Sequence, residues 1–86
     1  QFVAALGGGT ESLRLTVQMA NVPGQFAQLA SRIAQVHGNI ISALTYPAEL
    51  PERINITLRI EGADRDTILG VISDMLDLDV LHSWSC

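Results

Sequence analysis

The residues best suited to chemistry in this chain lie in two short polar segments. The first is Asn21-Val22-Pro23-Gly24, and the second is Gly38-Asn39-Ile40. An asparagine amide both donates and accepts hydrogen bonds, and a glycine lets a ligand approach the backbone closely. Asparagine is also a common turn and capping residue, and it tolerates the left-handed conformation. The two asparagines therefore have a binding interpretation and a structural one, and the sequence leaves both open.

Residues for catalysis or metal binding form no recognised pattern. Neither His37 nor His82 has a second ligand at a local spacing such as i, i+4. The single cysteine, Cys86, allows neither an internal disulfide nor a thiolate cluster. Ser42 and Ser73 lie in no nucleophile motif. We expect no catalytic residues, no metal site and no cofactor.

The composition is that of one small acidic domain. The chain has 86 residues, of which 48% are hydrophobic and 16% charged, and its net charge is -4. Its five basic residues are scattered arginines outnumbered by nine acids, which disfavours nucleic acid as a partner. No apolar run is long enough to span a membrane. The single cysteine fits a reducing, cytoplasmic compartment.

The amino-terminal residues differ in character from the rest of the chain. The sequence begins with Gln1 rather than methionine, has no secretory signal, and is rich in glycine over residues 7–12. We therefore expect residues 1–12 to be a linker or the end of a preceding domain. Residues 13–86 are expected to form the folded domain.

Four segments have the composition of β-strands. Leu13–Met19 and Ile54–Glu61 alternate apolar and polar residues, which is typical of a half-buried strand. Asn39–Tyr46 is rich in isoleucine, leucine and threonine, and Leu78–Trp84 is a fourth, short strand.

Two segments are predicted to be helices. Between Gln25 and His37, apolar residues recur at three- and four-residue spacing, and Gly38 follows as a terminator. Asp64 is a plausible cap for the second helix. The apolar stripe of that helix is expected to be Ile68, Leu69, Ile72, Met75 and Leu76.

The order of these elements predicts an α+β fold of the ferredoxin-like βαββαβ type. Its four-stranded antiparallel sheet carries two helices on one face, and the second and fourth strands lie at the edges. The second strand is apolar on both faces, and such an edge invites pairing with another chain. Its expected faces are Ile40, Ser42 and Leu44 on one side and Ile41, Ala43 and Thr45 on the other.

With the elements placed, the sequence resembles the ACT domain family. The residues that carry the resemblance are the Pro-Gly turn at 21–24 and the Asn-Ile pair at 39–40, separated by one helix. The resemblance covers Leu13 to Trp84. Residues 38–60 are also similar to ACT domains that follow paired cystathionine-beta-synthase-type modules in acetoin-utilisation-type proteins, and residues 2–7 would then be the exit from the last such module.

The resemblance implies a regulatory domain that is not an enzyme. In the family, a small molecule, frequently an amino acid, binds where the first turn faces the second strand, commonly across a homodimer interface. Unpaired N–H groups at the start of the first helix suit a carboxylate. The implied ligand-binding residues are Asn21, Val22, Pro23, Gly24, Gln25, Phe26, Gly38, Asn39 and Ile40, and the expected dimer interface is Ile41, Ala43 and Thr45.

One position departs from the family pattern. Many members have an aspartate at the position of Asn21, so a ligand ammonium group would lose a charged partner there. The sequence thus predicts a regulatory module that dimerises, binds a small-molecule effector and controls an attached domain. The alternative is a purely structural dimerisation module without a ligand.

Overall fold

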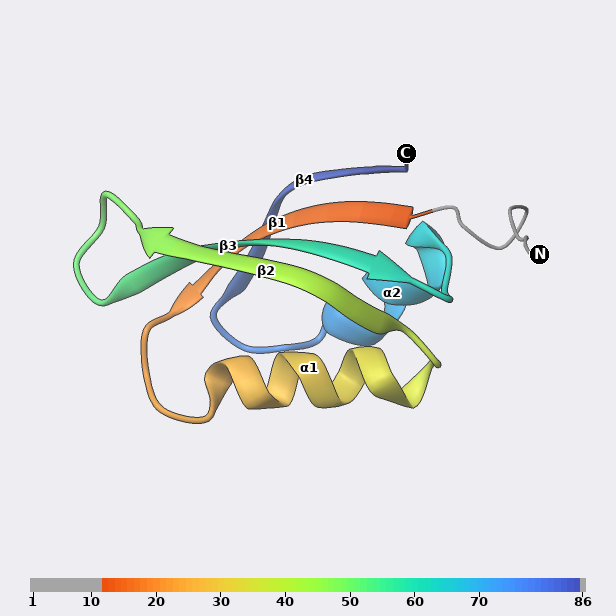
Figure 1. The fold of residues 1–86 in the computed structure, drawn as a ribbon. Coiled ribbons are helices and arrows are strands. Elements are labelled where there is room, and N and C mark those ends of the chain that lie inside the picture. Colours follow the sequence, from red (N-terminus) through yellow and green to blue (C-terminus); the bar gives the residue numbers. More distant parts are fainter. Residues whose placement is uncertain (1–11, 86) are drawn as a thin grey trace.

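The computed structural model describes residues 12–85, which form an open sheet with two helices on one side (Figure 1). None of the helices in this range is long and apolar enough to cross a membrane. The predicted linker lies outside the described residues except for Ser12, which is the first residue of a strand. The elements in chain order are β1 (Ser12–Ala20), α1 (Gln25–Gln35), β2 (Asn39–Pro47), β3 (Arg53–Glu61), α2 (Arg65–Ile72) and β4 (Leu78–Ser85).

The sheet has the strand order β2-β3-β1-β4, and every neighbouring pair is antiparallel. This confirms the predicted ferredoxin-like fold, with β2 and β4 at the edges. The central pair, β1 and β3, is continuous from Ser12 opposite Glu61 to Ala20 opposite Arg53. Because side chains alternate along a strand, this register assigns every residue of the two strands to one face.

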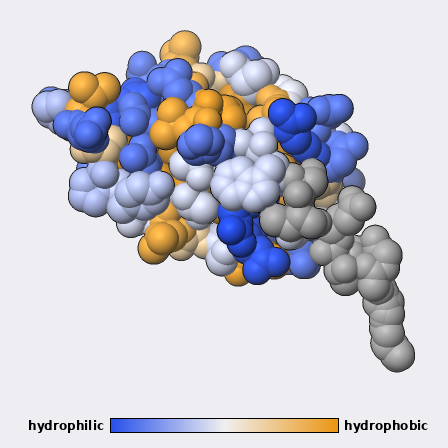
Figure 2. Space-filling model, turned by 90° about the horizontal axis from the view of Figure 1, so that it is seen from above, coloured by the Kyte–Doolittle hydropathy of each residue, from blue (hydrophilic) through white to orange (hydrophobic). Residues whose placement is uncertain are grey.

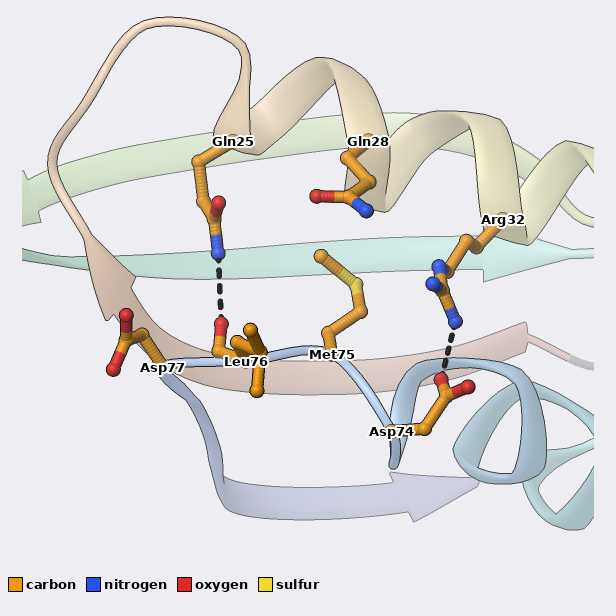
Figure 3. A pocket seen from close by; sticks show the side chains of 7 residues that line it. All are labelled: Gln25, Gln28, Arg32, Asp74, Met75, Leu76 and Asp77. Carbon is orange, nitrogen blue, oxygen red and sulfur yellow. Dashed lines mark hydrogen bonds and ion pairs between the residues drawn. The ribbon is translucent and has the colours of Figure 1, made fainter.

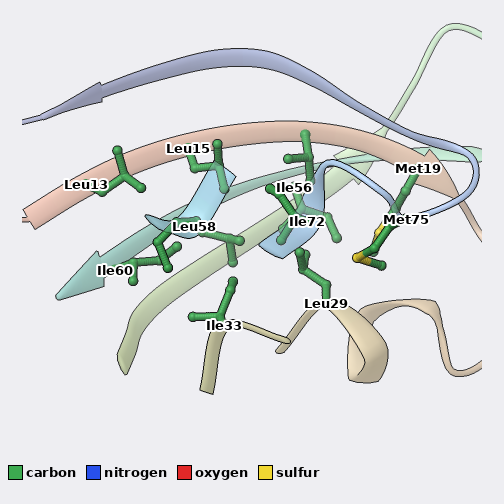
Figure 4. Close-up of a cluster of buried hydrophobic side chains, with 12 residues drawn as sticks. Leu13, Leu15, Met19, Leu29, Ile33, Ile56, Leu58, Ile60, Ile72 and Met75 are labelled. Carbon is green, nitrogen blue, oxygen red and sulfur yellow. The ribbon is translucent and has the colours of Figure 1, made fainter. Parts of the chain in front are cut away.

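The core lies between the helices and the apolar face of β1 and β3 (Figure 4). The alternating apolar residues of both strands are buried there, and Leu29 and Ile33 of α1 are fully buried against them. Burying a side chain of this size contributes about 1.5–3 kcal/mol. The core residues are Leu13, Leu15, Val17, Met19, Leu29, Ile33, Ile56, Leu58, Ile60, Ile68, Ile72 and Met75.

The junction between α1 and β2 depends on a close approach at Gly38. A Cβ atom at this position would lie 2.6 Å from Ile33 Cγ2 and 3.0 Å from the Ile33 carbonyl oxygen. The left-handed residue that ends the helix is His37, with φ 67°, whereas Asn39 is already in β2. The structural explanation considered for Asn39, that it ends the helix in a left-handed conformation, is therefore wrong.

The predicted faces of the second strand are wrong because β2 contains a β-bulge. Ile40 pairs with Ile60 but Ser42 pairs with Arg59, so Ile41 is an extra residue. Beyond the bulge the side of each residue is reversed. Ile40, Ala43 and Thr45 are now opposite buried β3 residues, while Ser42, Leu44 and Tyr46 are opposite the polar ones.

The second helix is shorter than the apolar pattern predicts. It ends at Ile72, and Ser73 follows as the cap. Met75 remains buried from the connection to β4, but Leu76 is 84% exposed. Asp77, next to it, has a left-handed backbone with φ 61°, as does Glu52 between β2 and β3 with φ 63°. The apolar residues between positions 68 and 76 thus belong first to a helix and then to an irregular segment.

The sheet face away from the helices is polar along the central strands β1 and β3. Thr16 and Thr57 share a hydrogen bond of 3.0 Å, and the Gln18 amide donates to Asn55 Oδ1 at 3.1 Å. His82 and Trp84 lie on this face, with their ring centroids 6.2 Å apart in an edge-to-face arrangement. Figure 2, which looks from the side opposite α1, shows hydrophilic residues interspersed with hydrophobic ones.

The Gly38 contact gives a prediction with an internal control. We expect Gly38→Ala to lower the free energy of unfolding by about 1–3 kcal/mol, because the new methyl group must displace Ile33. Gly70→Ala is the matched control, since Gly70 is inside α2 and its added Cβ would meet nothing within 4 Å. That substitution should raise stability by about 0.5–1 kcal/mol. If urea unfolding gave the same change in the free energy of unfolding for both variants, the close approach at Gly38 would be contradicted.

The cap of α2 gives a pH prediction. Hydrogen bonds from the side chain and backbone N–H of Thr67 lower the pKa of the Asp64 carboxyl. A pKa that is lower in the folded state means that the ionised group stabilises the fold above its unfolded pKa. This stabilisation is lost as the pH falls below about 4. Thermal unfolding should show a larger acid-induced loss for the native chain than for Asp64→Asn, which keeps a capping side chain. The same loss in both would exclude this role.

Candidate functional site

The turn between β1 and α1 leaves the start of the helix open. Gly24 precedes α1 with φ 87°, and a Cβ there would meet nothing within 4 Å. No side chain caps the helix, and its first turn contains no acidic residue. Among the described residues, no acceptor bonds the backbone N–H groups of Phe26 and Ala27. The positive end of α1 is therefore available to an anionic group.

The predicted turn residues are held in place but accessible. The Asn21 N–H donates to the Glu52 carbonyl oxygen at 2.8 Å, which fixes the turn against the β2–β3 connection. Asn21, Val22, Pro23 and Gly24 are exposed, and Phe26 is 40% exposed. These residues present backbone and side chains at one end of the sheet.

The second group of predicted ligand residues lies at the opposite end of the sheet. Asn39 pairs with Glu61, which itself pairs with Ser12 at the start of β1. Asn21 follows the other end of the same strand, so about 27 Å of strand separates the two groups. Gly38, Asn39 and Ile40 of one chain therefore cannot share a small ligand with that chain's own turn.

A hollow of about 450 Å³ begins beside this turn (Figure 3). One wall is a face of α1, with Gln25, Gln28 and Arg32 at helical spacing. The other wall is the connection from α2 to β4. The residues on that side are Asp74, Met75, Leu76 and Asp77.

Three polar contacts join α1 to α2 and the connection that follows it. The Gln25 amide donates to the Leu76 carbonyl oxygen at 3.2 Å. Arg32 forms an ion pair with Asp74 and donates to the Val71 carbonyl oxygen at 3.1 Å. Gln28 lies between these contacts, facing Met75 (Figure 3).

Two polar groups of the hollow, an amide and a carboxylate, have no partner among the described residues. No hydrogen bond joins the Gln28 amide to the residues described in the structure, and no ion pair there involves Asp77. A volume of this size is within the range of small-molecule sites. The hollow can therefore offer the Gln28 amide to an anionic group and the Asp77 carboxylate to a cationic one.

Of the predicted ligand residues, only Gln25 lines the hollow. Gln28 and Arg32 were missed, although polar residues at 25, 28 and 32 follow one helical face beside the apolar stripe. Asp74 had no sequence signal because its segment was interpreted as helix, and Asp77 had none because it fell between the predicted second helix and fourth strand. Residues 12–85 contain no group of three histidine, cysteine, aspartate or glutamate residues that could hold a metal ion.

Comparison with known families identifies the class of protein. Residues 8–81 match the ACT domains, which are regulatory ligand-binding modules, and the matching family is described as TTHA0829-like ACT domain. This chain belongs to the TTHA0829-like ACT domain family. No curated protein matches the sequence.

Solved structures of low sequence identity share the fold. An unknown protein from Galdieria sulphuraria superposes with a TM-score of 0.72 at 11% identity, over 88% of this chain and 45% of that protein. An ACT domain protein from Streptococcus pneumoniae gives 0.63 at 15% identity, over 87% and 89% of the two chains. The ACT domain of a GTP pyrophosphokinase from Chlorobium tepidum gives 0.58 at 12% identity, over 87% and 96%. The chain thus spans less than half of the Galdieria protein but nearly all of the isolated ACT domains.

Proposed function

We propose that this domain regulates an attached domain by binding a small amino-acid-like molecule at the start of α1, within a homodimer. The observation that carries the proposal is the polar hollow of about 450 Å³ beside the uncapped helix end. The ACT family supports a regulatory role. The GTP pyrophosphokinase of Chlorobium tepidum is an example of a larger protein that contains such a domain.

The groups around the hollow suit a zwitterion. The free N–H groups of α1 and the Gln28 amide favour a carboxylate. An ammonium group needs an anionic partner, which Asn21 does not supply. Asp77 at the rim of the hollow supplies it instead. The lack of an aspartate at position 21 is therefore compatible with an amino-acid ligand.

The dimer in this proposal forms through the exposed edge of β2. In an antiparallel pair of two β2 strands, the Asn39 end of one copy lies beside the Pro47 end of the other. Pro47 is opposite Ile54, which is opposite Met19, two residues before Asn21. Asn39 and Ile40 of a second copy would thus reach the turn that they cannot reach within one chain.

Regulation follows if the ligand favours one arrangement of the two copies. A ligand shifts such an equilibrium only by its difference in affinity between the two states, typically about 1–3 kcal/mol. A cystathionine-beta-synthase-type partner domain, as in acetoin-utilisation-type proteins, and a cytoplasmic location remain parts of this proposal.

A structural dimerisation module without a ligand is the second candidate function. The observation that favours it is the apolar character of the β2 edge. Ile41 is 41% exposed and Leu44 is 66% exposed, and an uncovered edge strand of this kind tends to pair. The two candidates share the interface and differ only in the hollow.

Ligand binding is tested by thermal unfolding against a panel of free amino acids. One compound should stabilise the native chain by about 2.7 kcal/mol at 100 times its dissociation constant. Gln28→Met and Asp77→Asn should weaken this effect, since each removes a polar group of the hollow. Asparagine also tolerates the left-handed backbone at position 77.

Matched controls for the ligand test are Gln35→Met on the far end of α1 and Asp66→Asn on α2, both exposed and outside the hollow. They should respond to the amino acid as the native chain does. No response to any amino acid would favour the structural module. If the amino acid still stabilised both Gln28→Met and Asp77→Asn as it does the native chain, the hollow would not be the binding site.

The interface is tested separately by sedimentation. Ile41→Lys and Ala43→Lys should convert a dimer to a monomer, because each places a charge along the β2 edge. Ala34→Lys, on an exposed position of α1, is the control and should remain dimeric. A native chain that sediments as a monomer, or lysine variants that stay dimeric, would contradict pairing through β2.

A further inference from the structure

Two arginines lie directly opposite one another on the helix-free face of the sheet. Arg14 of β1 and Arg59 of β3 are paired residues in the antiparallel register. Paired side chains in such a register have Cβ atoms about 4.5–5.5 Å apart, and like charges placed there destabilise the pair. The arrangement is therefore unfavourable unless something neutralises it.

No carboxylate of the described residues neutralises these two arginines. The ion pairs in this part of the chain are Arg32 with Asp74 and Arg53 with Asp79. Glu61 is on the same face as Arg59, two residues along β3, but forms no ion pair with it. Within residues 12–85, two of the five arginines of a chain with net charge -4 thus have no carboxylate partner and form a positive site.

The neighbouring side chains hold both guanidinium groups. Arg14 is opposite Trp84 of β4, and its Cζ lies 5.7 Å from the centre of the tryptophan ring, a cation–π contact. Arg59 donates to Ser12 Oγ at 3.5 Å, and on its other side it is opposite Ser42 of β2. One row across all four strands therefore contains an indole, two guanidinium groups and the Ser42 hydroxyl group.

The chemistry of this row indicates its ligand. Two adjacent guanidinium groups present planar sets of donors that suit a phosphate, and each N–H to oxygen contact would be charge-assisted. Trp84 is 42% exposed beside them and offers a flat surface on which a planar ring can stack. We propose that Arg14, Arg59 and Trp84 form a binding site for a small phosphate-bearing ligand, with a nucleotide as the form that uses all three residues.

A long polyanion fits this face less well. Glu61 lies beyond the arginine row in one direction along the strands, and Asp79, opposite Gln18, lies beyond it in the other. An extended nucleic acid strand would meet these carboxylates, whereas a mononucleotide would not. The site is also separate from the hollow beside α1, which is on the helix side of the sheet.

The experiment is a titration of the full chain with ADP, followed by the fluorescence of Trp84. This is the single tryptophan of the chain, so its emission reports on the site. We expect saturable quenching by ADP, and a loss of affinity of at least about tenfold in both Arg14→Gln and Arg59→Gln. Arg65→Gln, on the exposed surface of α2, makes the same change in net charge and should bind as the native chain does.

A second measurement separates binding from folding. Without ligand, Arg59→Gln should unfold at the same or a higher temperature than the native chain, because it removes the repulsion between paired like charges. Inorganic phosphate should raise the unfolding temperature of the native chain but not that of the variant. A variant that is destabilised without ligand and keeps its response to phosphate would assign Arg59 a structural role and overturn the proposal.

The remaining measurements distinguish a nucleotide from free phosphate as the ligand. ADP binding more tightly than inorganic phosphate supports a nucleotide, and equal affinities support a free phosphate. Absence of binding by both, or equal weakening by Arg65→Gln, would overturn the site. Affinity for oligonucleotides that increases with their length would overturn the proposal that the ligand is small. A dimer that dissociates in Arg14→Gln would show that a second copy covers the row, and this would overturn the ligand site.

Discussion

The continuous antiparallel register between β1 and β3 determines the rest of the structure. It places Leu13, Leu15, Leu58 and Ile60 together on the helix side, where α1 and α2 cover them. A slip of one residue would move these side chains to the open face and bring Arg14 and Thr16 into the core. The same register places Thr16 opposite Thr57 and Arg14 opposite Arg59. The core and the polar face are therefore consequences of a single alignment.

The two faces of the sheet consequently provide two different chemical environments. On the helix side, the gap between α1 and the connection to β4 is bridged at Gln25 and Arg32 and contains carboxylates. On the other side, polar side chains satisfy one another along the middle of the sheet, and Arg14 and Arg59 have no carboxylate partner among residues 12–85. The net negative charge of the chain does not show that the carboxylates of the hollow and these two arginines lie on opposite sides of the sheet.

Most of the fold could be predicted from the sequence because it depends on local periodicity. Alternation located the central strands, and apolar spacing located α1. The bulge at Ile41 and the early end of α2 at Ile72 could not be predicted, since both leave the apolar pattern unchanged. Of the candidate sites, Gln25 was predicted from a family motif. The hollow could not be predicted because it depends on the path of the connection from α2 to β4 through Asp77. The arginine pair could not be predicted because it depends on the register between β1 and β3. The spacing of residues along the chain determines neither of these.

Three of the connections pass through non-glycine residues with a left-handed backbone, at His37, Glu52 and Asp77. Such a conformation is accessible to glycine and asparagine but is costly for β-branched residues. The backbone at these positions therefore restricts which residues can replace them, even though their side chains are exposed. Valine or isoleucine at any of the three positions would place a branched Cβ in this unfavourable conformation. The conformation of a connection thus restricts the sequence at positions where burial does not.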